Sequence, residues 1–172
     1  MIKMMRNQTF EIKETLLASK GKRLGNFLID YIIQYLLMTG FGYVIFFISE
    51  MTASYGLYNL IIQNDSFLTN YIIGAFILIL YYIINEGLTK RSLGKFITQT
   101  KVVMIDGSEP KFRDILIRTL CRLIPFEMLS FLGVNGKGWH DQLSNTYVVN
   151  AKEFDDSLRQ SMEIDSIGKL PE

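Results

Sequence analysis

"YIIGAFILILYYII", Tyr71 to Ile84, contains no charged side chain and forms the centre of a longer apolar segment, Phe67 to Leu88. A second apolar segment, Leu24 to Ile48, carries a single charge at Asp30. At about 1.5 Å per residue, either segment could cross a hydrocarbon core of about 30 Å as a helix. A buried hairpin of a soluble helical domain is the alternative, but most of both segments lacks a polar face. We therefore predict a membrane α-helical fold with spans at 24–48 and 67–88.

The composition fits one domain of a membrane protein. The chain has 172 residues, of which 49% are hydrophobic, and a net charge of +1. Its one cysteine, Cys121, cannot form an internal disulfide, and no cysteine or histidine cluster has the spacing of a metal site. We expect the lipid bilayer as a partner, and we expect no cofactor, no metal and no nucleic acid.

Basic residues are distributed unevenly around the two spans. Residues 1–23 and 89–113 hold six each, and the connector 49–70 holds none. They are Lys3, Arg6, Lys13, Lys20, Lys22 and Arg23, then Lys90, Arg91, Lys95, Lys101, Lys111 and Arg113. The positive-inside rule predicts that both ends of this helix pair lie in the cytoplasm. Because the N-terminus lacks the shape of a signal peptide, we expect a multi-pass protein of the cell (inner) membrane that keeps its first span.

A polar stripe runs along the first span. Four polar residues recur at spacings of three and four: Arg23, Asn26, Asp30 and Gln34. Residues at these spacings share one side of a helix. A charged aspartate at the centre of a membrane helix costs about 2.5 to 3.5 kcal/mol on insertion scales. We therefore expect the stripe to face protein or trapped water, and Asp30 to have partners.

The next hydrophobic segment, 114–132, is a poor candidate for a third span. It contains Arg118 and Arg122, four residues apart on one helical side, and Pro125 interrupts it. An interfacial or re-entrant helix that breaks near Pro125 is favoured over a full crossing. If the segment does not cross, Arg118 or Arg122 could reach the acidic stripe of the first span.

A small cytoplasmic β-sheet is predicted from three segments. Residues 98–105 are rich in β-branched side chains and end in a turn signal, "DGSEP". "NTYVV", 145–149, is a natural second strand, and "QTFEI", 8–12, could be a third. Such a sheet would place Asp141 beside the membrane surface. The membrane domain is then 1–152, and the acidic tail 153–172 is predicted to be disordered or a short exposed helix.

These blocks together resemble a known family. "GKRLGNFLIDYII", "GLTKRSLGKFITQTKVVMIDGSEP", "RTLCRLIPF" and "GWHDQLSNTYVV" are similar, in order and spacing, to the RDD family of bacterial membrane proteins. The arginine and two aspartates that name the family match Arg23, Asp30 and Asp141. The resemblance covers roughly residues 20–150. It implies a suspected transport role, since some members look like sodium/proton antiporters.

Three functions follow from these residues. In the first, Asp30 binds Na⁺ or H⁺ for ion transport, which requires a homo-oligomer because two spans enclose little space. In the second, an Arg/Asp network docks the sheet on the helices of a non-transporting structural or accessory protein. An enzyme is the least favoured, because His140 beside Asp141 has no visible nucleophile motif. The candidate ion-pair or ion-binding residues are Arg23, Asn26, Asp30, Gln34, Arg118, Arg122 and Asp141.

Overall fold

The computed structural model describes residues 12–64, 66–133 and 137–167. Within these ranges the chain is mostly helical, with one small sheet. The elements in order are η1 (Glu14–Leu16), α1 (Lys20–Thr52), α2 (Gly56–Ile61), α3 (Phe67–Thr89), α4 (Leu93–Ile97), β1 (Thr100–Met104), α5 (Phe112–Cys121), η2 (Glu127–Leu132), α6 (Trp139–Leu143), β2 (Thr146–Asn150) and α7 (Ala151–Ile167).

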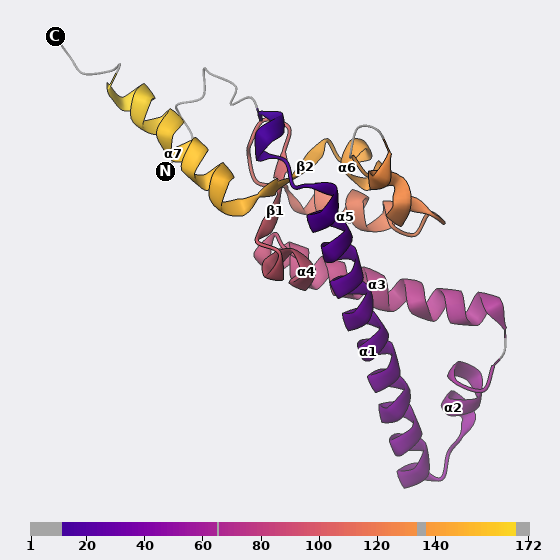
Figure 1. Cartoon of the computed structure of the whole chain (residues 1–172). Coiled ribbons are helices and arrows are strands. Elements are labelled where there is room, and N and C mark those ends of the chain that lie inside the picture. Colours follow the sequence, from indigo (N-terminus) through magenta and orange to yellow (C-terminus); the bar gives the residue numbers. More distant parts are fainter. Residues whose placement is uncertain (1–11, 65, 134–136, 168–172) are drawn as a thin grey trace.

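Two long helices correspond to the predicted spans. α1 has 33 residues and α3 has 23, and both are long and apolar enough to cross a membrane. Only 11% of the most apolar window of each helix is buried, whereas the core helix of a soluble protein would be mostly buried. In Figure 1 the first turns of α1 and the last turns of α3 lie near the sheet, the two helices diverge from there, and α2 lies between their far ends. The prediction of two long apolar helices is confirmed.

The two predicted strands form an antiparallel pair. β1 and β2 pair in a register that places Val103 opposite Tyr147 and Lys101 opposite Val149. The third strand proposed for 8–12 lies almost entirely outside the described residues, and Ile12 itself is not in a strand. Leu17 instead forms an isolated bridge to Val149. A small core gathers where these segments meet: Leu16, Val103, Val149 and Phe154.

The segment after β1 breaks where the sequence predicts. α5 has ten residues and is therefore about 15 Å long, too short to cross a bilayer. Turns follow it, Phe126 adopts a left-handed backbone conformation with φ 65°, and η2 begins at Glu127. Pro125 explains the break, because proline cannot donate the backbone hydrogen bond that a continuing helix needs.

The residues before the second strand form a helix that was not predicted. Trp139 to Leu143 is the short helix α6, and the strand begins at Thr146, one residue after its predicted start. Of the two alternatives given for the acidic tail, the structure has the helix: α7 continues as far as residue 167. Its first turn is held by Phe154, which is 1% exposed, and by an ion pair between Lys101 and Asp155.

Candidate functional site

Asp141 is held between two arginines from different helices. Its carboxylate accepts a hydrogen bond from Arg23 of α1 at 2.6 Å and one from Arg118 of α5 at 2.6 Å. Arg118 also donates to the hydroxyl of Thr146 at the start of β2. Asp141 and Arg118 are both 0% exposed. One carboxylate on α6 thus connects α1, α5 and the sheet, as the predicted Arg/Asp network requires.

His140 and the two arginines together determine the ionisation of Asp141. Burial alone would raise its pKa, but the opposing effects of His140, Arg118 and Arg23 are larger and hold the pKa well below its usual range. The carboxyl group therefore stays ionised at neutral pH. Asp141 also accepts a hydrogen bond from the backbone N–H of Gly138 at 3.3 Å, which caps α6.

Asp30 has partners other than those predicted. It is 2% exposed, and it accepts hydrogen bonds from Tyr81 at 2.6 Å, Tyr82 at 3.3 Å and the backbone N–H of Gly94 at 2.8 Å. Arg118 and Arg122 pair with other carboxylates. Of the possible contacts between these arginines and the stripe, Arg122 lines the same cavity as Asp30 but pairs with Glu86. The hydrogen-bond partners of Asp30 are therefore three neutral donors.

Glu86 is the carboxylate that Lys95 and Arg122 contact. It is not among the site residues predicted from the sequence. It lies in the last turn of α3, is 1% exposed, and accepts from Lys95 and Arg122 at 2.8 Å each. Arg118 Nε lies 3.7 Å away from its second oxygen. The sequence does contain a signal that could have identified Glu86 as a site residue, because it is the one charged residue between Phe67 and Leu88.

The remaining predicted residues, Asn26 and Gln34, form polar contacts on the same side of α1. The amide of Asn26 lies between the hydroxyl groups of Thr98 and Thr100. Gln34 is hydrogen-bonded to Tyr82. The stripe therefore faces protein, as expected, and Asn26 contacts the first strand directly.

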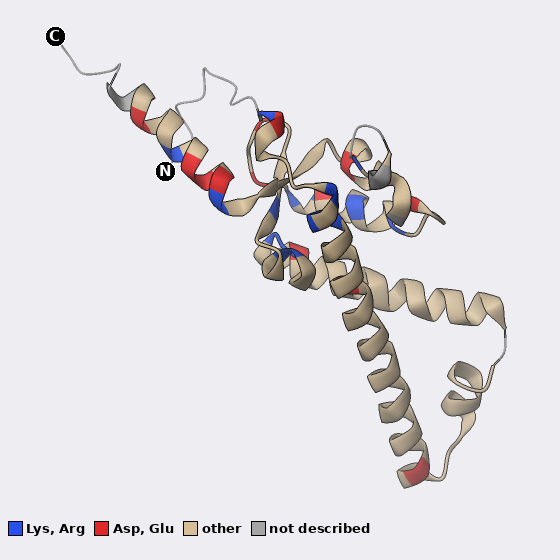
Figure 2. Ribbon diagram, in the orientation of Figure 1, with Lys and Arg blue, Asp and Glu red and all other residues tan. Residues whose placement is uncertain are grey.

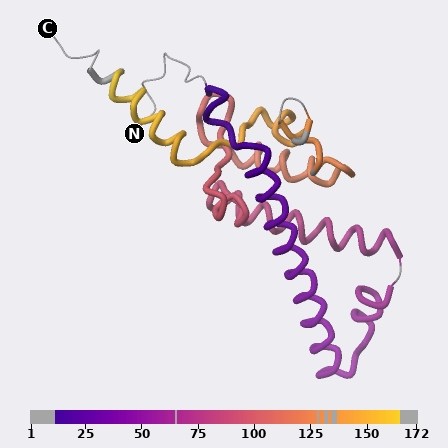
Figure 3. The backbone as a smooth tube through the Cα atoms, viewed as in Figure 1, coloured from indigo at the N-terminus to yellow at the C-terminus, as the bar shows by residue number. Residues whose placement is uncertain are grey.

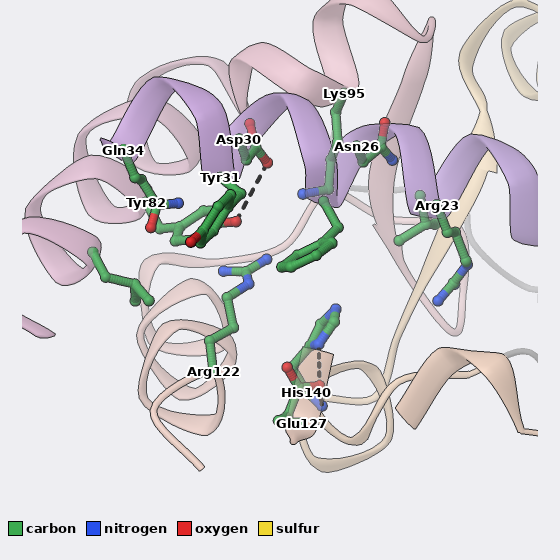
Figure 4. A pocket seen from close by; sticks show the side chains of 13 residues that line it. Arg23, Asn26, Asp30, Tyr31, Gln34, Tyr82, Lys95, Arg122, Glu127 and His140 are labelled. Atoms are coloured by element: carbon green, nitrogen blue, oxygen red, sulfur yellow. Dashed lines mark hydrogen bonds and ion pairs between the residues drawn. The ribbon is translucent and has the colours of Figure 1, made fainter. Parts of the chain in front are cut away.

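A small cavity lies along this stripe (Figure 4). Its volume is about 220 Å³. It is lined by residues from α1, α3, α4, α6, β2 and the segment between α5 and α6: Arg23, Asn26, Phe27, Asp30, Tyr31, Gln34, Leu78, Tyr82, Lys95, Arg122, Glu127, His140 and Val148. Five of the seven predicted site residues are in this lining. The other two, Arg118 and Asp141, are fully buried and are not part of the cavity wall.

Glu127 and His140 form a further pair in the cavity wall, and this pair was not predicted from the sequence. Glu127 Oε1 lies 2.5 Å from His140 Nδ1, and Figure 4 marks this interaction. Burial would raise the pKa of Glu127, but the hydrogen bond and the charge of His140 outweigh it and lower the pKa. Burial lowers the pKa of His140, against the attraction of Asp141 and Glu127.

The chemistry that this arrangement allows is binding through charge and hydrogen bonds. Four basic side chains and four carboxylates are packed together, and the described residues include no group of three His, Cys, Asp or Glu side chains that could hold a metal ion. The basic residues are Arg23, Lys95, Arg118 and Arg122, and the acidic ones are Asp30, Glu86, Glu127 and Asp141.

Comparison with known protein families identifies a family for this chain. The sequence model of the RDD family matches residues 17–145, which include every residue of the charge network and of the cavity wall except Val148. No curated protein and no solved structure matches the chain.

Proposed function

The chain belongs to the RDD family, and on this basis we propose that it is a multi-pass membrane protein with a structural or accessory role. In this proposal the Arg/Asp network docks a cytoplasmic sheet on two membrane spans and keeps a small polar cavity open between them. In this role the protein holds its sheet in place on the two spans and carries out no catalytic step.

The exposed surfaces of α1 and α3 support the membrane placement. Large apolar side chains such as Tyr35, Phe47 and Ile72 are more than half exposed along the two helices. Exposed apolar patches of this extent are rare on soluble monomers. A bilayer would cover them, and the six, zero, six distribution of basic residues would orient the sheet toward the cytoplasm.

One observation carries the accessory role: the carboxylate oxygens of Asp30 already accept hydrogen bonds from Tyr81, Tyr82 and Gly94. A sodium site needs several oxygen atoms that turn their lone pairs toward the ion. Here the nearest groups turn donors toward Asp30 instead, and Lys95 lines the same cavity. This arrangement favours a fixed structural carboxylate over an ion carrier.

The test of the network is a double-mutant cycle on the pair Arg23 and Asp141. Asp141→Asn alone should destabilise the protein by about 3 to 5 kcal/mol, because two buried guanidinium groups lose their counter-charge. Adding Arg23→Gln should recover part of this loss, since fewer cations are then unpaired. The measurement is the thermal unfolding of detergent-solubilised protein, with Asp156→Asn on the exposed face of α7 as the control. Strictly additive effects would contradict the proposal.

Cation transport is the second candidate, and one observation favours it. Asp30 and Gln34 line the cavity, so an acid within a proposed span borders a space that could hold an ion or water. A pathway of this kind would require a homo-oligomer. Exchange of Na⁺ for H⁺ in the cell (inner) membrane is the form of transport that the family resemblance suggests.

Reconstituted vesicles distinguish the two functions. We expect the wild-type protein to move no protons in response to a sodium gradient, as measured with an internal pH-sensitive dye. Sodium-dependent proton movement that disappears in Asp30→Asn, with the amount of folded protein unchanged, would overturn the accessory role and establish transport.

A further inference from the structure

A buried donor without an acceptor marks one wall of the cavity. The side chain of Arg122 is 9% exposed, and its Nη2 donates to Glu86 at 2.8 Å. Its Nη1 is buried and has no hydrogen-bond partner among the described residues. The guanidinium carbon lies 3.7 Å from the centre of the Tyr82 ring, and Figure 4 shows the group pointing into the cavity. An unsatisfied donor on a charged group is costly, so an acceptor atom placed here would stabilise the protein.

The carboxylates of the cavity wall already accept hydrogen bonds from neighbouring residues. Asp30 accepts from two tyrosines and Gly94, and Glu127 accepts from His140. The basic residues of the wall are Arg23, Lys95 and Arg122. What the wall lacks is an acceptor oxygen for Arg122, and the chemical group that supplies strong acceptors to arginine is a carboxylate or a phosphate.

Part of the cavity lining is apolar or aromatic and comes from the two long helices. Phe27, Tyr31 and Leu78 form this part, and Tyr31 is 57% exposed. A volume of about 220 Å³ is below the roughly 300 to 1,000 Å³ of a drug-sized ligand site. A small polar group therefore fits inside, and any chain attached to it must lie outside, along the exposed apolar surface.

We propose that this cavity binds the phosphate of an anionic phospholipid, with Arg122 Nη1 as the donor and the acyl chains along α1 and α3. The inference rests on the membrane placement proposed above, because a bilayer supplies this ligand at high concentration. The site overlaps the Arg/Asp network only at Arg23, since Arg118 and Asp141 do not line the cavity.

The first experiment measures binding to the purified full chain in neutral detergent. Short-chain phosphatidylglycerol should raise the thermal unfolding temperature in a saturable manner, because a ligand of the folded state stabilises it. Inorganic phosphate and short-chain phosphatidylcholine at the same concentrations should have little effect. An equal shift with inorganic phosphate would overturn the lipid as the source of the phosphate. An equal shift with phosphatidylcholine would overturn the preference for an anionic headgroup.

Two variants locate the site. Arg122→Lys keeps a positive charge near Glu86 but removes the free nitrogen, and should weaken phosphatidylglycerol binding at least about tenfold. Leu78→Trp fills the cavity without changing any charge and should abolish binding. Leu80→Trp is the matched control, because Leu80 lies on the same helix, is 42% exposed and does not line the cavity.

Affinity that is unchanged in both Arg122→Lys and Leu78→Trp would overturn the proposal, as would an equal loss in Leu80→Trp. If Arg122→Lys does not fold, Leu78→Trp and its control still decide the question. Binding in micelles does not depend on topology. A reporter-fusion experiment that contradicts the predicted topology would therefore remove the proposed membrane placement, but it would not change the binding result for Arg122→Lys.

Discussion

Gly94 allows α4 to approach α1 closely because it has no side chain. Its backbone N–H donates to Asp30 at 2.8 Å, so α4 must approach α1 very closely. A Cβ atom at this position would lie 2.4 Å from the carbonyl oxygen of Asn26 and 2.9 Å from Asp30 Oδ1. Neither distance is tolerated between non-bonded atoms, and the first atom belongs to the backbone of α1. The contact between α1 and α4 therefore depends on glycine.

We predict that Gly94→Ala destabilises the protein by about 1 to 3 kcal/mol, because the added methyl group must push α4 away from Asp30. Gly87→Ala is the matched control. Gly87 lies inside α3 with no atom within 4 Å of the added Cβ, so alanine there should leave stability unchanged or slightly higher. Thermal unfolding in detergent gives both values. Equal effects of the two substitutions would show that the close approach at Gly94 is unimportant.

The acids of the site predict a dependence of stability on pH. The pKa values of Asp141 and Glu127 are lowered from 3.8 and 4.5, so both groups bind protons less tightly in the folded chain than in the unfolded chain. Their stabilisation is therefore complete above these ordinary values and is lost as the pH falls below them. The unfolding temperature should drop from about pH 5 downward, and the drop should be smaller in Asp141→Asn. An unfolding temperature that rises on acidification would contradict this sign.

The sequence predicts the members of the site better than their partners. Spacing along one helix identifies Arg23, Asn26, Asp30 and Gln34, because side chains three and four residues apart share a face whatever the tertiary structure. Which carboxylate meets which arginine depends on how the helices cross, and no local pattern encodes that. The pairing of Arg122 with Glu86 and of Asp30 with two tyrosines could therefore be read only from the structure.

The two strands form one antiparallel pair whose register can be tested. We predict that Val103→Cys and Tyr147→Cys, which are directly opposite, form a disulfide within one chain on mild oxidation. Val102→Cys with Tyr147→Cys should not, because neighbouring residues of a strand point to opposite faces. Cys121 is replaced by serine in both variants, and the readout is the mobility of the non-reduced protein on a gel. Cross-linking of equal yield in both pairs would exclude this register.

Long elements are predicted accurately and short ones are not. Tens of apolar residues specify α1 and α3 independently of their surroundings, and a β-branched run specifies each strand. α4 and α6 have five residues each, too few to be stable without tertiary contacts. Both are fixed by the site itself: Gly94 of α4 donates to Asp30, and Asp141 of α6 pairs with two arginines. The carboxylates of the site thus hold the helices that the sequence does not reveal.

Charged residues are concentrated at one end of the molecule. In Figure 2 most Lys, Arg, Asp and Glu residues lie around the sheet, on the short helices and along α7, and the shafts of α1 and α3 are almost free of them apart from an acidic segment at the far end of α1. This separation follows from the sequence, since the connector 49–70 holds no basic residue. It predicts one orientation for the whole protein.

We predict that reporters fused after Gly21, Ile105 and Lys152 all report the cytoplasm, and that one fused at Asn64 reports the outside. A pair of reporters active only on opposite sides of the membrane gives the measurement, and fusion abundance is the control. An outside signal at Lys152 alone would mean that 115–132 crosses the membrane, against the short α5 and its break. Cytoplasmic signals at all four positions would refute two spans.

In the proposed membrane placement, the divergence of the two long helices, seen again along the tube of Figure 3, determines how they fit the bilayer. At about 1.5 Å per residue, the 33 residues of α1 measure about 50 Å and the 23 of α3 about 35 Å. Helices that diverge cannot both stand along the bilayer normal, so at least one must tilt, and the longer α1 has the excess length to do so. The far ends then occupy more area in one leaflet than the near ends do in the other. A wedge of this shape should concentrate where a membrane curves so as to expand that leaflet, and should redistribute when vesicles are made flatter.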